Sequence, residues 1–131
     1  MSYQVNEKEF ENVIRLPSFD RYQYFLNRVA DWEEVWSVGH EEGWRMMSDA
    51  EETVCIPVWP ARAFAEACCQ GDWSGDEPRV ISLDDWMTRW LPGMCDDGRK
   101  VAVFPLPSDQ GLVLDVDRLR EDLEETLEQY E

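Results

Sequence analysis

The four cysteines and the single histidine are the residues of this chain with the most reactive side chains. A nucleophilic cysteine needs a nearby base or cation to hold its thiolate, and His40 is the only histidine available. Cys55 falls in an apolar run, Cys68 falls on the apolar side of a predicted helix, and Cys95 precedes two aspartates that disfavour a thiolate. The pattern therefore predicts structural thiols and no catalytic cysteine–histidine pair.

Metal ligands do not recur at the spacings that metal sites use. Zinc sites usually show pairs such as Cys-x-x-Cys, whereas Cys68 and Cys69 are adjacent and would point to different sides of a helix. The acidic stretches 72–77 and 96–98 lack the alternating ligands of a calcium loop, and the chain has no glycine-rich phosphate loop. We therefore expect no metal and no other cofactor, and we expect a protein that is not an enzyme.

Charge is the strongest feature of the composition, because 29 acidic residues against 12 basic ones give a net charge of −17. Such a surface repels nucleic acid and anionic membranes, and it attracts proteins with a basic face. No apolar run approaches the roughly 20 residues of a membrane span, and the N-terminus does not resemble a signal peptide. We expect a cytoplasmic protein that binds neither nucleic acid nor membranes directly, although the charge is also compatible with solubility alone.

Seven tryptophans in 131 residues are many, and one of them lies in an unusual place. Trp73 falls in the stretch 71–78, whose two glycines, proline and acids predict an exposed loop. An exposed tryptophan with a rim of carboxylates is typical of the centre of a protein interface. The candidate partner-binding residues are Trp73, Asp72, Asp76, Glu77 and Trp59. The alternative is that Trp73 folds back and fills the core of its own domain.

Helices and strands that would position these residues can be predicted from periodicity and turn residues. In the first half, a short helix capped by Asn6 ends before Pro17. Ser18 caps a second helix with an apolar face and a polar face. The inward residues are Tyr22, Phe25, Leu26 and Val29, and the outward residues are Asp20, Arg21, Asn27 and Arg28. Strands at 35–38, 44–48 and 53–58 would form a meander, in which Pro57 needs an unpaired side. A helix follows from Pro60 to Gly71.

In the second half, the exposed loop leads to a short strand at 79–82 at most. Ser82 caps a helix whose apolar residues recur from Leu83 to Leu91, and Pro92 with Gly93 would end it before a loop at 94–98. Strands at 101–104 and 112–114 would form a hairpin. The last helix begins after Asp115 and extends to Tyr130.

This order predicts an α+β fold with a mainly antiparallel sheet of about five strands and helices packed on it. The length suits one globular domain over 1–131, in which 1–17 is an N-terminal helical extension and 18–131 is the core.

Short motifs spread over residues 20 to 130 resemble the bacterial domain-of-unknown-function family numbered 2750. They are Asp31-Trp32-Glu33-Glu34-Val35-Trp36, Gly43-Trp44, Pro57-Val58-Trp59-Pro60, Phe64-Ala65-Glu66, Trp73-Ser74-Gly75, Trp90-Leu91-Pro92-Gly93, Val101-Ala102-Val103-Phe104-Pro105 and the terminal Leu119-x-x-Asp122-Leu123-Glu124. The resemblance implies a small cytosolic bacterial protein and implies no activity. The stretch from the strand at 53–58 into the following helix also resembles, more weakly, the N-terminal domain of the SseB secretion-enhancer proteins.

Three hypotheses for function remain open at this stage. The first is a non-enzymatic protein-interaction module, such as an adaptor or an immunity-type inhibitor, that docks a partner with a basic surface. The second is a small-molecule-binding or enzymatic domain with an aromatic cleft between the helix after Pro60 and the helix at 83–91. The third is a nucleic-acid mimic that presents the carboxylates of the last helix.

Overall fold

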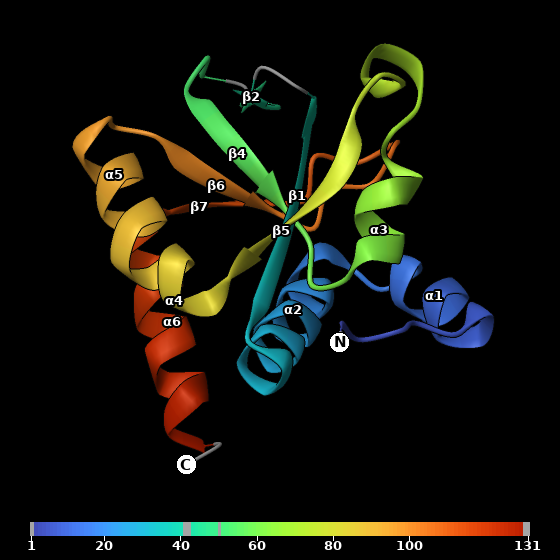
Figure 1. Ribbon diagram of the computed structural model, residues 1–131, viewed down its shortest axis with the longest axis horizontal. Coiled ribbons are helices and arrows are strands. Elements are labelled where there is room, and N and C mark those ends of the chain that lie inside the picture. Colours follow the sequence, from blue (N-terminus) through green and yellow to red (C-terminus); the bar gives the residue numbers. More distant parts are fainter. Residues whose placement is uncertain (1, 41–42, 50, 130–131) are drawn as a thin grey trace.

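The structure is a computed structural model that describes residues 2–40, 43–49 and 51–129. The middle of the predicted turn at 41–42, Ala50 and Tyr130 lie outside the described residues. Two small sheets lie at the centre of the fold and helices surround them (Figure 1). The predicted α+β class is confirmed, although the strands are divided between two sheets.

Two N-terminal helices begin and end close to where the sequence places them. α1 (Glu7–Ile14) begins after Asn6, whose side chain accepts a hydrogen bond from the Glu9 N–H at 2.8 Å. α2 (Ser18–Trp32) begins after Pro17 and has no side-chain cap, so Ser18 is its first residue instead of its cap. The predicted inward face of α2 is buried, but Arg21, which we expected to face solvent, is buried as well.

The first sheet has three antiparallel strands in the order β2-β1-β5. β1 (Glu34–His40) pairs with the short β2 (Gly43–Trp44) and, from Glu34 to Gly39, with β5 (Glu77–Ser82). Sequence analysis placed 77–78 in a loop, but both residues pair with β1. Pro78 is tolerated there because β5 has only one neighbour and so lies at an edge of the sheet.

The second sheet has four strands in the order β3-β4-β6-β7. β4 (Val54–Val58) pairs antiparallel with β3 (Met47–Ser48) and parallel with β6 (Lys100–Val103). β7 (Leu112–Asp115) pairs antiparallel with β6 and confirms the predicted hairpin. The predicted meander is wrong, because the run 44–48 divides into β2 and β3, which belong to different sheets.

The two sheets meet at a pair of tryptophans. The backbones of Trp36 and Trp59 exchange two N–H···O hydrogen bonds of 2.9 and 2.8 Å, and the Ser37 hydroxyl donates to the Pro57 carbonyl at 2.7 Å. β3 pairs only with Val54 and Cys55. Pro57 therefore lies between the pairing with β3 and the pairing at Trp59, where its missing N–H leaves no ladder bond unmade.

A helical segment runs from 83 to 96 and is longer than predicted. It consists of α4 (Leu83–Asp85), a π-helical turn (Trp86–Trp90) and α5 (Leu91–Asp96). The Ser82 side chain accepts from the Asp85 N–H at 3.1 Å, as the predicted cap requires. Pro92 does not end the helix, because the preceding π-helical turn shifts the hydrogen-bond register and no donor is needed at that position.

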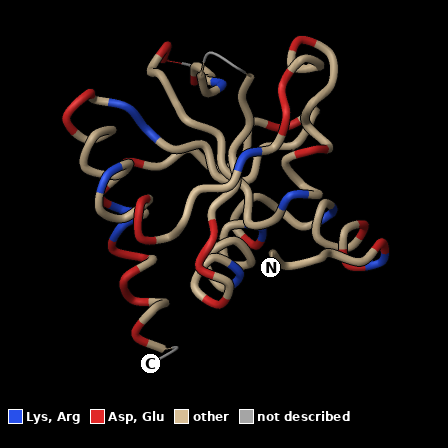
Figure 2. Tube along the Cα trace, viewed as in Figure 1, with Lys and Arg blue, Asp and Glu red and all other residues tan. Residues whose placement is uncertain are grey.

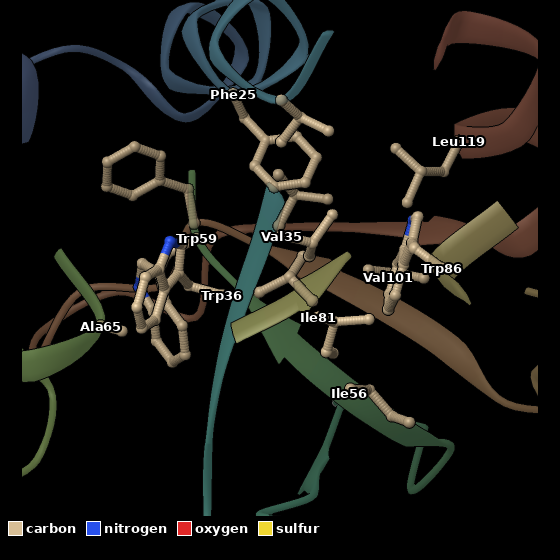
Figure 3. Packing of buried hydrophobic residues seen from close by; sticks show 14 of the residues in the cluster. Phe25, Val35, Trp36, Ile56, Trp59, Ala65, Ile81, Trp86, Val101 and Leu119 are labelled. Atoms are coloured by element: carbon tan, nitrogen blue, oxygen red, sulfur yellow. The ribbon is translucent and has the colours of Figure 1, made fainter. Parts of the chain in front are cut away.

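The remaining helices are α3 (Arg62–Ala67), a 3₁₀ turn (Gly71–Trp73) and α6 (Val116–Gln129). One apolar core joins side chains from both sheets and from the helices on either side; Figure 3 shows Phe25 of α2, Val35 of β1, Ile81 of β5 and Leu119 of α6 among them. No helix among the described residues combines the length and the apolar character that a membrane span requires.

Candidate functional site

A cleft of about 600 Å³ lies beside Trp73, between two loops that are far apart in the sequence. One wall is the segment 70–73, which follows α3 and contains the 3₁₀ turn. The other wall is the loop 105–110, which connects β6 to β7. Met47 and Cys68 complete the lining. The cleft therefore depends on both loops keeping their positions.

Trp73 is half-buried and forms part of the first wall. Its backbone N–H donates to the Gln70 carbonyl at 3.0 Å, and its ring meets the ring of Trp59 edge-on, with the ring centres 6.5 Å apart. The side chain thus packs against the core while part of it lines the cleft. Trp73 is therefore neither fully exposed, as an interface tryptophan would be, nor fully buried in the core of its own domain.

A buried carboxylate holds the Trp73 loop against the first sheet. The Asp76 side chain is 1% exposed and accepts two hydrogen bonds from the Arg45 guanidinium, at 2.6 and 3.1 Å. The His40 Nδ1 atom lies 3.3 Å from the same carboxylate, and the Arg45 guanidinium lies 5.7 Å from the centre of the Trp73 ring. Asp76 is therefore a support of the loop, and the expectation that it forms an exposed rim does not fit its burial.

The second wall is fixed by an ion pair with the buried Arg21. Arg21 donates to the Asp109 carboxylate at 3.0 Å and to the Phe104 carbonyl at 3.3 Å, and Asp109 also accepts from the Gly111 N–H at 2.8 Å. The Gly111 hydrogen bond lowers the pKa of Asp109, burial opposes it, and Arg21 lowers it further. Asp109 is therefore ionised at neutral pH.

Below the cleft, the Pro105 carbonyl joins the loop 105–110 to the core. It accepts from the Trp59 indole N–H at 2.8 Å and from the Cys68 thiol at 3.3 Å. Trp59 is fully buried, so its side chain supports the cleft and cannot form part of a docking surface. Burial raises the pKa of Cys68 to about 11, so this thiol stays protonated and is a poor nucleophile at neutral pH.

The cleft has an acidic and partly apolar lining. Asp72 and Asp109 are the charged residues that line it, and none of the described lining residues is basic. Trp73, Leu106 and neighbouring prolines supply apolar surface. A cleft of this composition favours an amphipathic cation, whose apolar part can contact the walls and whose charge can meet a carboxylate.

Two of the five candidate residues from the sequence, Trp73 and Asp72, line this cleft. Glu77 is exposed at the start of β5 and is not part of the lining. Sequence reasoning missed the loop 105–110 as a wall of the site. Its one available signal was Asp109 two residues before Gly111, a spacing at which an aspartate side chain often accepts a backbone N–H.

The cleft beside Trp73 is not the aromatic cleft expected between the helix after Pro60 and the helix at 83–91, because no residue of 83–91 lines it. The cavity beside α3 opens at the C-terminal end of that helix and faces the loop 105–110. The predicted helix after Pro60 is also shorter than expected, because α3 begins at Arg62 and ends at Ala67.

A second acidic surface follows α6, where Figure 2 shows acidic positions recurring along the helix. Glu121, Glu124, Glu125 and Glu128 are exposed. Arg118 lies 3.0 Å from Asp122, and Arg120 lies 2.7 Å from Asp117, so arginines partly neutralise the row. The surface is acidic without an unbroken series of free carboxylates.

Cys55, Cys69, Cys95 and His40 are not among the described residues that line the cleft. Burial raises the pKa of Cys55 and of Cys69, and His40 contacts Asp76. In the part of the chain that the structure describes, no group of three or more histidines, cysteines or acids is arranged to hold a metal ion.

Comparison with known proteins gives one match. A family model described as a protein of unknown function, DUF2750, matches residues 22–123 and leaves α1 outside the matched region. No curated protein and no solved structure matches the chain, and the weaker likeness to the SseB domain finds no support. Because the match covers well over half of the chain, the protein belongs to the DUF2750 family.

Proposed function

We propose that this protein is a non-enzymatic, cytoplasmic interaction module that docks a basic surface of a partner protein at the cleft beside Trp73. The observation that carries the proposal is the composition of the cleft. It combines a half-buried tryptophan with two carboxylates, and none of its described lining residues is basic. An adaptor or an immunity-type inhibitor would use a site of this kind.

Charge and packing would contribute to docking in different ways. The net charge of −17 would speed the encounter with a basic partner and make its rate fall with ionic strength. Affinity would come from desolvating Trp73 and the apolar walls around it, because buried aromatic residues dominate most interfaces. Both walls are held by ion pairs with arginines before any partner arrives, which lowers the ordering cost of binding.

The non-enzymatic part of the proposal is supported by the state of the thiols. Burial raises the pKa values of Cys55, Cys68 and Cys69, which keeps all three thiols protonated at neutral pH. All four cysteines are free thiols, in agreement with a reducing compartment.

A second candidate function follows from the size of the same cleft. A volume of about 600 Å³ is within the range of pockets that bind small molecules. A ligand bound there would raise the melting temperature by mass action. A thermal-shift screen of metabolites therefore separates this candidate from protein docking.

Affinity capture from a nuclease-treated bacterial lysate at moderate salt tests the docking proposal. The tagged wild type is compared with Trp73→Ala and with Trp32→Ala, a matched truncation of a tryptophan that is 38% exposed. We expect one stoichiometric partner that Trp32→Ala retains and Trp73→Ala loses, with unchanged circular dichroism for both variants. A partner that survives Trp73→Ala would show that docking occurs elsewhere.

A further inference from the structure

We infer that the cleft beside Trp73 receives a single arginine side chain of the partner, with its guanidinium paired to Asp72 and its stem against Trp73 and Leu106. This inference rests on the proposed function and names the group that the site recognises. It is carried by a comparison between the two walls of the cleft and by the charges of the residues that line it.

Behind each wall, an arginine outside the cleft lining lies between a carboxylate and an aromatic ring. Behind the first wall, Arg45 forms two hydrogen bonds with Asp76 and lies 5.7 Å from the centre of the Trp73 ring. Behind the second wall, Arg21 pairs with Asp109 and lies 5.8 Å from the centre of the Phe104 ring. The fold therefore builds the same kind of contact once on each side of the cleft.

Asp72 is the carboxylate of the cleft that remains available for a partner. Asp109 uses one oxygen for Arg21 and the other for the Gly111 N–H. Asp72 is exposed in the same wall as Trp73, and its charge helps to raise the pKa of Arg45, but its side chain lies within 4.0 Å of no basic group among the described residues. A cation that enters the cleft beside Trp73 therefore has Asp72 as its counter-charge.

Arginine suits this site better than lysine for two reasons. The guanidinium is planar and weakly hydrated, so it can stack on an aromatic ring and leave water more easily than an ammonium. The partly apolar lining would favour the same choice for a group that comes from outside.

Nuclear magnetic resonance of the tryptophan indole N–H groups tests the inference without a known partner. The probes are the acetylated methylamides of arginine, lysine and citrulline, and Trp73→Phe assigns the Trp73 signal. We expect the arginine probe to shift that signal saturably, and we expect the lysine probe to bind with a dissociation constant several-fold higher. The citrulline probe, which has the shape of arginine without its charge, should cause no saturable shift.

Two variants each remove one carboxylate charge, one inside the cleft and one outside it. Asp72→Asn should weaken binding of the arginine probe about tenfold, the effect of losing a hydrogen bond between charged groups. Glu77→Gln, the matched control outside the cleft, should leave it unchanged. Equal binding of citrulline, equal effects of the two variants, or no response to arginine at tens of millimolar would each overturn the inference. A partner captured through Trp73 would still support the proposed function in that case, so the two claims fail separately.

Discussion

Replacing Asp76 by asparagine should release the Trp73 loop from the first sheet. The Asp76 carboxylate is almost fully buried and accepts two hydrogen bonds from Arg45, whose side chain is 29% exposed. Breaking a buried ion pair costs about 3–5 kcal/mol when the remaining charge is left without solvent. Arg45 can recover part of its hydration, and asparagine can still accept one hydrogen bond. We therefore expect Asp76→Asn to lower the free energy of unfolding by about 2–3 kcal/mol.

Urea unfolding followed by far-ultraviolet circular dichroism measures this loss. For a small domain with a slope of about 2 kcal/mol per molar urea, the midpoint should fall by about 1–1.5 M. Glu77→Gln is the matched control, because it removes the same charge from the next residue at an exposed position. Its free energy of unfolding should change by less than about 0.5 kcal/mol. Equal effects of the two variants would refute the role assigned to Asp76.

Three further predictions concern other parts of the structure. Burial would raise the pKa of Glu9, but hydrogen bonds from two tyrosines and the charge of an arginine hold that pKa below its ordinary 4.5. The ionised carboxylate therefore stabilises the fold above pH 4.5, and this stabilisation is lost as the pH falls. Thermal unfolding should show that Glu9→Gln loses less stability in acid than the wild type does. At Gly111, φ is +78° and a Cβ would collide with the neighbouring backbone, so Gly111→Ala should cost at least about 1 kcal/mol, whereas Gly75→Ala, in open space, should not. Cys95 is exposed, whereas Cys68 is buried and its pKa is raised to about 11. A thiol reagent should therefore modify Cys95 first, and Cys95→Ser should remove the fast phase of the labelling reaction.

Local signals predicted the helices well. The Asn6 and Ser82 caps and the apolar faces of α2 and α6 involve residues close together in the sequence, and each is present in the structure. The π-helical turn could not be predicted, because no capping or breaking residue within 86–90 signals it. Pro92 was therefore misread as the end of the helix.

Long-range pairing decided what the sequence could not show. β5 extends to Glu77 because β1 offers it a partner over six residue pairs, and no pattern within 77–78 indicates a strand. Arg21 and Asp76 lie in polar stretches, yet each is buried because an opposite charge or a carbonyl from a distant segment meets it. Sequence analysis found Trp73 and Asp72 as candidate residues but not the opposite wall, which only the fold brings close.

Hydrogen–deuterium exchange with and without a captured partner tests the central claim most directly. If docking occurs at the cleft beside Trp73, amide exchange should slow in the segments 70–73 and 105–110, and the exposed side of α6 should exchange as in the free protein. Protection confined to α6 would contradict the account and favour the nucleic-acid mimic, in which the carboxylates of that helix make the contact.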